Sequence, residues 1–211
     1  MLEQLQEQWN QVLNKHSELP GISQDTFNDL VHRYSDPERA YHNLHHIVQL
    51  LQTAETFKAR LHDYKAVFLA IWFHDAVYNP LANDNEIESA ALADTHLSRL
   101  LLEEKSVEKV KKMILATAHH LQLEEGSSPD TLFLLDFDLM ILGSSQEEYK
   151  TYSSQIRKEY QSIPDLLYKP GRKRILQRFL ETKRLFKTEE FYILYEHQAR
   201  TNIQWELSLL G

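Results

Sequence analysis

Apolar residues recur every three to four positions along most of the chain, which is the spacing of amphipathic helices. Strict alternation of apolar and polar residues over the length of a strand is hard to find. The pattern therefore predicts an all-α fold. Helices are expected at about 2–17, 23–34, 40–58, 63–77, 86–104, 107–121, 131–142, 145–161, 171–186 and 188–209.

Turn-forming residues divide these helices. Asp36–Pro37 is an N-cap and first-turn signal for the segment leading into 40–58. Pro170–Gly171 marks a break between two C-terminal helices, and EEGSSPD at 124–130 is expected to be a loop. No linker is long enough to separate two domains, so we expect a single domain over 1–211.

Composition fits this interpretation. The chain has 211 residues, of which 42% are apolar and 26% charged, so it can bury one substantial core. The longest apolar run, AVFLAIWF at 66–73, has eight residues, whereas a membrane span needs about 20. The first residues include Glu3 and Glu7 instead of a basic and then an apolar segment. We therefore expect no secretory signal, no membrane partner and a cytoplasmic location.

Charge and cysteine content limit the partners and metal ligands that the chain can have. The net charge is −8 with histidine neutral, which argues against nucleic acid as a partner. Basic residues gather at 169–187, but such a patch is usually a solvated helix face. Because the chain has no cysteine, a bound metal must use imidazole and carboxylate.

Six of the 11 histidines fall in three short segments: His42, His45 and His46, then His74, then His119 and His120. His42 and His46 are four residues apart, so on a helix they share a face, and Arg39 lies on that face too. Two imidazoles at this spacing could share a metal ion, or one could bind it while the other handles a proton. Partly buried histidines that bond to the backbone are the simpler alternative. His119 and His120 close a predicted helix, where the helix dipole favours a cation whatever the function.

Carboxylates occur within two apolar segments. His74–Asp75 follows AVFLAIWF directly, and Asp136 and Asp138 are the exceptions in LFLLDFDLMIL at 132–142. An ionised aspartate in a buried helix is costly unless a cation or hydrogen bonds compensate its charge. Asp136 and Asp138 lie about 200° apart around a helix axis. We therefore expect only one of them to point into a given site, and the other to orient a ligand without touching the ion.

This order of elements resembles the HD superfamily of metal-dependent phosphohydrolases. YHNLHH at 41–46 looks like the YHNxxH element of the cyclic-nucleotide phosphodiesterases in that superfamily. FHDAVY at 73–78 resembles the defining His–Asp pair, and DFDLMILG at 136–143 resembles the late aspartate element. The resemblance implies an HD-domain-like helical bundle with a buried metal site. It also implies that His42 is the general acid and that the metal ligands are His46, His74, Asp75 and Asp138. Asp136 is then the aspartate that does not touch the ion.

The chain is most similar to a bacterial group of uncharacterised predicted HD phosphohydrolases of about this length. Shared motifs are RxYHNxxH from Arg39, DNEIESA at 84–90, ATAHH at 116–120, YKPGR at 168–172 and ARTN at 199–202. Ile87 departs from the group, which commonly has a second acid there. The resemblance covers nearly the whole chain and implies a metal-binding core at about 35–145 with C-terminal helices at about 145–209 packed on it.

These residues favour a hydrolase of a phosphate ester, with a nucleotide or another small phosphorylated metabolite as substrate. Mixed nitrogen and oxygen ligands do not select among manganese, magnesium, iron, nickel, cobalt and zinc. Asp75 or Asp138 could accept a proton from the attacking water. Candidates for a phosphate contact are Arg39 and Arg172, and candidates for a second metal or the substrate are His119, His120 and Glu86.

Two alternatives stay open. One is an HD-type di-iron oxygenase, in which His119 and His120 would supply additional ligands. The other is a non-catalytic helical module that binds a metal, a nucleotide or a partner. The sequence leaves the oligomeric state undetermined, and a homodimer is compatible with it.

Overall fold

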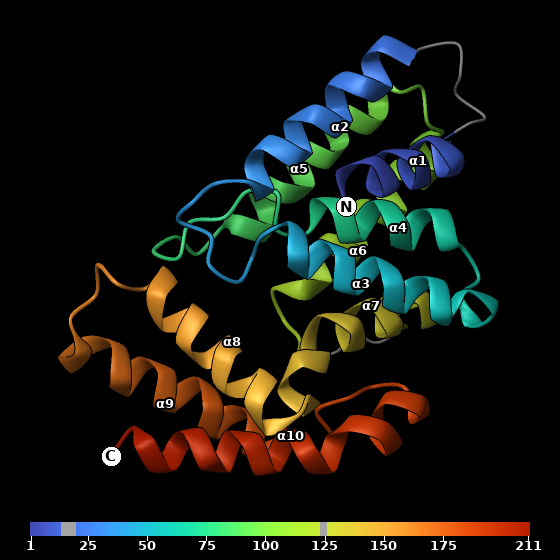
Figure 1. Ribbon diagram of the computed structural model, residues 1–211. Helices are drawn as coiled ribbons and strands as arrows, with labels where there is room; N and C mark the ends of the chain where they lie inside the picture. Colours follow the sequence, from blue (N-terminus) through green and yellow to red (C-terminus); the bar gives the residue numbers. More distant parts are fainter. Residues whose placement is uncertain (14–19, 123–125) are drawn as a thin grey trace. The chain divides into compact units, whose positions relative to one another are not determined.

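The computed structural model describes residues 1–13, 20–122 and 126–211, and Figure 1 shows them as helices joined by loops. No strand occurs among these residues, so the all-α prediction is confirmed for them. None of the described helices combines the length and apolar character needed to cross a membrane. The chain divides into two compact units, Met1–Ala118 (unit 1) and His119–Gly211 (unit 2). The expectation of a single domain stays a prediction.

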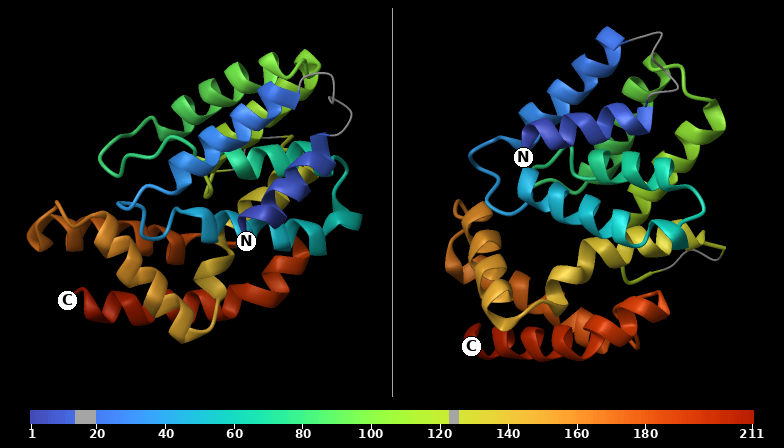
Figure 2. Two further views of the ribbon diagram at one scale, coloured as in Figure 1. Left: turned by 45° about the horizontal axis from the view of Figure 1, so that its top comes forward. Right: turned by 45° about the vertical axis from the view of Figure 1, so that its right-hand side comes forward.

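Unit 1 is built around one apolar helix, α4, in which every residue from Ala66 to Phe73 is buried. The helices α3, α5 and α6 pack against it. Aromatic rings join α4 to the first two helices. The ring centroid of Trp72 lies 5.8 Å from that of Trp9 and 5.5 Å from that of Phe27. In each view of Figures 1 and 2, α1 accordingly lies beside α4. The elements of unit 1 are α1 (Leu2–Leu13), α2 (Pro20–Tyr34), α3 (Leu44–Thr56), η2 (Lys58–Arg60), α4 (Tyr64–Phe73), α5 (Asn85–Arg99) and α6 (Glu104–Thr117).

Unit 2 is built around its last and longest helix, α10, which packs against η3, α8 and α9. A Cβ on Gly143 would lie 2.6 Å from the Cβ of Tyr195, so only glycine allows η3 to approach α10 this closely. From α10, the Asn202 amide donates to the carbonyls of Leu142 and Ser144, each at 2.9 Å. The elements of unit 2 are α7 (Pro129–Leu139), η3 (Met140–Gly143), α8 (Gln146–Glu159), α9 (Asp165–Glu181) and α10 (Glu189–Leu209).

Several helix boundaries differ from the prediction. The helix expected at 40–58 begins at Leu44, because Asn43 caps it, and the Asp36 carboxylate instead accepts from the Glu38 N–H in the preceding loop. The helix expected at 63–77 ends at Phe73. Residues 14–17 of the first predicted helix and 124–125 of the predicted loop lie outside the described residues.

The expected break at Pro170–Gly171 is wrong, because both residues lie inside α9. A proline within a helix leaves one carbonyl of the preceding turn without its N–H partner. That carbonyl belongs to Leu166, which is 84% exposed, so water can take the place of the missing donor.

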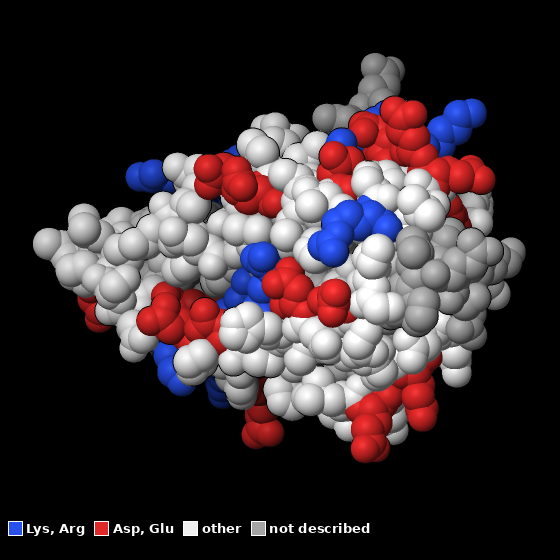
Figure 3. Space-filling view, turned by 90° about the horizontal axis from the view of Figure 1, so that it is seen from above, with Lys and Arg blue, Asp and Glu red and all other residues white. Residues whose placement is uncertain are grey.

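On the face shown in Figure 3, Lys and Arg side chains lie in separate groups among Asp, Glu and uncharged residues.

Candidate metal centre

The turn before α3 places two of the candidate histidines. The Asn43 side-chain oxygen accepts from the His45 N–H at 2.9 Å, and its amide donates to two carbonyls of the preceding turn. These bonds fix the turn that carries His42 and start the helix that carries His46. The His46 side chain is buried, and its ring packs 4.9 Å from the ring of Tyr41.

His74 is the C-cap of α4, and Asp75 follows it immediately. The Nδ1 atom of His74 lies 2.8 Å from the carbonyl oxygen of Ile71. Because a carbonyl can only accept, Nδ1 carries the ring proton, and in the neutral ring Nε2 presents a lone pair on the other side. Metal-binding histidines are commonly oriented in this way by a hydrogen bond from the second ring nitrogen.

Three ligand atoms converge at the end of α4. The Nε2 atoms of His46 and His74 lie 3.4 Å apart, and the His74 Nε2 lies 3.1 Å from an Asp75 carboxylate oxygen. All three residues can place one ligand atom within 4.8 Å of the others. Ligands that are about 2.0–2.2 Å from one ion lie roughly 3–4 Å from each other, so these distances fit a single metal ion. A metal ion would also suit the charge, because the Asp75 carboxylate lies beside the Nε2 of His74.

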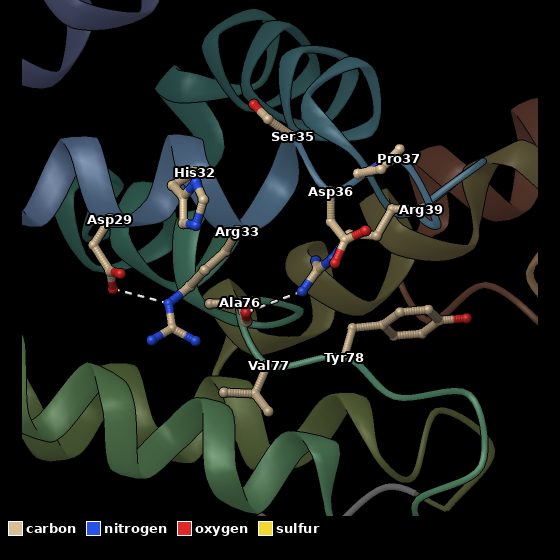
Figure 4. A pocket seen from close by; sticks show the side chains of 10 residues that line it. All are labelled: Asp29, His32, Arg33, Ser35, Asp36, Pro37, Arg39, Ala76, Val77 and Tyr78. Carbon is tan, nitrogen blue, oxygen red and sulfur yellow. Dashed lines mark hydrogen bonds and ion pairs between the residues drawn. The ribbon is translucent and has the colours of Figure 1, made fainter.

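The side chains of Tyr34 and Arg39 hold the backbone that carries these ligands. The Tyr34 hydroxyl donates to the carbonyl of Trp72 at 3.0 Å. The Arg39 guanidinium donates to the carbonyls of Asp75 and Ala76 at 2.7 and 3.1 Å, and Figure 4 shows it reaching Ala76. Carbonyls at a helix C-terminus lack partners within the helix, and a cation is favoured there. Arg39 therefore supports the loop that carries Asp75.

The first two turns of α5 fasten the loop that follows Asp75. The buried Ser89 hydroxyl accepts from the Val77 N–H at 3.0 Å and donates to the Val77 carbonyl at 3.2 Å. The Asn85 side chain likewise accepts from the N–H of Asn79 and donates to its carbonyl, both at 2.9 Å. The DNEIESA segment thus holds HDAVY in place. Sequence reasoning missed both anchors, although a serine within the otherwise apolar run after Glu88 is a usable signal.

His42 lies close to the cluster, but not as expected from helix geometry. It precedes α3, so the prediction that His42 and His46 share a helix face is wrong. Their ring centroids are nevertheless 5.9 Å apart, because the turn bends His42 back toward the cluster. The half-buried ring of His42 packs 4.4 Å from the ring of Tyr78. This location would suit proton transfer beside the candidate metal site.

In unit 2, Asp138 contacts one of the paired histidines. The His120 Nε2 lies 2.8 Å from an Asp138 carboxylate oxygen, and each side chain is less than one-fifth exposed. His119 is exposed. Both histidines follow α6, which ends at Thr117, so the expectation that they close a helix is wrong.

Asp136 has partners of a different kind. One carboxylate oxygen accepts from the Lys187 N–H at 2.6 Å, and the other accepts from the N–H and the hydroxyl of Thr188 at 2.7 and 2.6 Å. Burial raises the pKa of Asp136, and these donors offset part of the increase. Thr188 is the N-cap of α10, so Asp136 secures the start of that helix. Its expected role beside a metal ligand stays a prediction.

Arg172 is also held inside unit 2. Its guanidinium donates to both carboxylate oxygens of Glu206 at 2.8 and 3.0 Å, and the Tyr149 hydroxyl donates to the same carboxylate at 2.6 Å. Burial alone would raise the pKa of Glu206, but these donors and the charge of Arg172 outweigh burial and lower it. The phosphate contact expected of Arg172 stays a prediction, and so does the role of Glu86, which lies half-buried in the first turn of α5.

Comparisons of the chain with protein-family models, with curated proteins and with solved structures give no match.

Proposed function

We propose that this chain is a metal-dependent phosphohydrolase of the HD type, acting on a phosphate ester of a nucleotide or another small phosphorylated metabolite. The observation that carries the proposal is the cluster of His46, His74 and Asp75, whose ligand atoms face one another at distances that fit a divalent ion. The motif order of the sequence supports the same assignment.

His46, His74 and Asp75 would hold the ion, which supplies the positive charge that lowers the pKa of a water molecule and binds a phosphate oxygen. Asp75 accepts a proton as the oxygen of the attacking water forms its bond to phosphorus. The bond from phosphorus to the leaving oxygen breaks, and His42 donates a proton to that oxygen. The products are an alcohol and phosphate, and both side chains then exchange protons with water.

The resemblance implies one more ligand, Asp138. This part of the proposal rests on the DFDLMILG motif alone. We expect Asp138→Asn to lower metal content and activity together, and a variant with normal metal content would remove Asp138 from the ligand set.

The proposal is tested by metal analysis of the purified protein and by a panel of phosphate esters assayed with several divalent metals. We expect bound metal and hydrolysis of at least one ester. His74→Ala and Asp75→Ala should each lose most of the ion and retain helix content by circular dichroism. His45→Ala is the matched control, because His45 is an exposed neighbour on the same helix as His46. Unchanged metal content in both cluster variants would refute the site.

The same experiment separates the alternatives. Bound metal without hydrolysis of any ester would overturn the proposal in favour of a non-catalytic module. Bound iron with an oxygen-dependent reaction would overturn it in favour of a di-iron oxygenase.

A further inference from the structure

Arg39 contacts the backbone of both functional segments in unit 1. One terminal nitrogen, Nη1, donates to the carbonyl of Asp75 at 2.7 Å and to the carbonyl of His42 at 3.3 Å. The other, Nη2, donates to the carbonyl of Ala76 at 3.1 Å. A single guanidinium therefore ties the turn that carries the proposed general acid to the loop that carries a proposed metal ligand.

Aromatic rings fix the plane of this guanidinium. The Arg39 Cζ lies 5.0 Å from the ring centroid of Tyr34 and 5.5 Å from that of Tyr78, distances at which a cation is attracted to a ring face. Tyr34 also donates to α4, and Tyr78 packs on His42. The groups that position Arg39 are therefore the same groups that surround the site.

We propose that Arg39 is a positioning residue, which sets the placement of His42 relative to Asp75 without touching substrate. The inference rests on the proposed function and deepens it. The terminal nitrogens of Arg39 donate to backbone carbonyls, so Arg39 differs from an arginine whose donors pair with a phosphate. A lysine could not replace it, because one ammonium cannot reproduce the planar arrangement of donors that reaches three carbonyls.

The structure also offers a way to test this assignment chemically. Arg39 lines a hollow of about 590 Å³, together with Arg33, Asp36 and Val77 (Figure 4). In an Arg39→Ala variant, a small guanidinium ion could enter through this hollow. Arg33 provides the matched control, because it lines the same hollow but its Nε donates to Asp29 on its own helix.

The experiment compares wild type, Arg39→Ala, Arg39→Lys and Arg33→Ala. Co²⁺ or Mn²⁺ affinity is measured by calorimetry, and turnover at saturating metal is measured on a phosphate ester with a poor leaving group and on an activated aryl ester. We expect both Arg39 variants to bind the metal about 10–100-fold more weakly, the usual effect of removing a group that orients a ligand. Turnover should fall more on the poor leaving group, because its oxygen depends on the proton from His42. Arg33→Ala should behave as wild type.

Ethylguanidinium, added well below denaturing concentrations, should restore part of the metal affinity of Arg39→Ala and leave that of Arg39→Lys unchanged. A residue needed only for folding would give equal losses on both esters and no such restoration, and this result would overturn the inference. A raised KM with normal metal affinity would also overturn it, because that pattern belongs to a phosphate-binding arginine. If wild type binds no divalent metal, the proposed function fails, whereas the inference alone fails if wild type binds metal and the Arg39 variants match it.

Discussion

One aspartate, Asp75, follows the apolar helix α4, and another, Asp136, lies within the apolar helix α7, and the surroundings of the two carboxylates differ in kind. At the end of α4, the Asp75 carboxylate lies 3.1 Å from the Nε2 of His74, whose other nitrogen faces a carbonyl. In α7, the Asp136 carboxylate accepts hydrogen bonds from two N–H groups and one hydroxyl. The first carboxylate lies beside side chains that can bind a metal ion, and the second is held by hydrogen bonds from the N-cap residue of α10 and the residue before it.

This difference matters because a buried carboxylate does not by itself indicate a metal. Donors from the backbone can satisfy it, as they do for Asp136, and so can a guanidinium, as Arg172 does for Glu206. At His46, His74 and Asp75, by contrast, three side chains that can each bind a metal ion lie within 4.8 Å of one another, so a cation could neutralise this carboxylate. Changes at the converging ligands should therefore affect metal binding and turnover, whereas changes at the donor-satisfied carboxylates should affect stability.

The largest effect is expected beside the converging ligands. His42→Ala should keep its metal and lose about 10²–10⁴-fold in turnover on an ester with a poor leaving group, the usual span for general acid catalysis. The loss should be smaller for an activated aryl ester, since its leaving oxygen needs little protonation. Steady-state kinetics on the two esters measure the loss in turnover, and metal analysis of the variant checks that the ion is retained. Loss of metal would make His42 a ligand, and equal losses on both esters would remove the general-acid role.

A large loss of stability is expected at the buried pair of unit 2. Glu206→Gln leaves Arg172 buried without its counter-charge and should reduce the free energy of unfolding by about 3–5 kcal/mol at neutral pH. The measurement is denaturant unfolding. Glu189→Gln is the control, because the Glu189 carboxylate is 66% exposed in its pair with Arg184, and it should cost no more than about 1 kcal/mol.

The same pair predicts a pH dependence. Since the fold lowers the pKa of Glu206 from its ordinary value of 4.5, ionised Glu206 stabilises the folded chain above pH 4.5. That contribution is lost as the pH falls from 4.5 through the folded-state pKa. The gap between wild type and Glu206→Gln should therefore narrow below pH 4.5, and a gap that stays constant would contradict the assignment.

A smaller loss is expected at Asp136. Asp136→Asn places an amide NH₂ against backbone donors and should cost about 1–3 kcal/mol, the penalty for a buried polar group left unsatisfied. Thermal unfolding measures the change. Metal content should stay at the wild-type level, and a loss of metal larger than that of Asp138→Asn would show that the two aspartates have the opposite roles.

The smallest effect is expected at an exposed carboxylate. Asp63 caps α4 and pairs with Lys109 at 3.0 Å, with both side chains more than one-third exposed. Lys109→Ala should change the free energy of unfolding by only about 0.2–1 kcal/mol, because water solvates the remaining charge. A loss as large as that of Glu206→Gln would show that exposure does not determine how much these ion pairs contribute to stability.

The sequence predicts much of this arrangement because its signals are local. The three- to four-residue spacing predicts the helices, and the His–Asp pair at the end of an apolar run predicts the cluster at α4. Helix ends were less predictable, because Asn43 competes with Asp36 as the start of α3 and only the bonds formed in the fold decide between them.

Partners distant in the chain could not be predicted. Asp136 is paired with residues about fifty positions later, and Arg172 with Glu206 in the following helix. Nothing in the neighbouring residues of Asp136 identifies a donor, so periodicity could only indicate that its charge needs compensation. The same is true of Arg39, whose carbonyl partners at Asp75 and Ala76 lie in another loop.

The hydrogen bonds of the Asn85 and Ser89 side chains determine which part of the loop after Asp75 can tolerate change. Asn85 closes the loop from Asn79 at its base, and Ser89 holds Val77 on the side nearest Asp75. The intervening stretch, 80–83, is therefore separated from the candidate metal ligands by the closed base of the loop. A change in its length or composition should leave the ligand geometry intact, so this stretch is a place where a designer could insert a new segment.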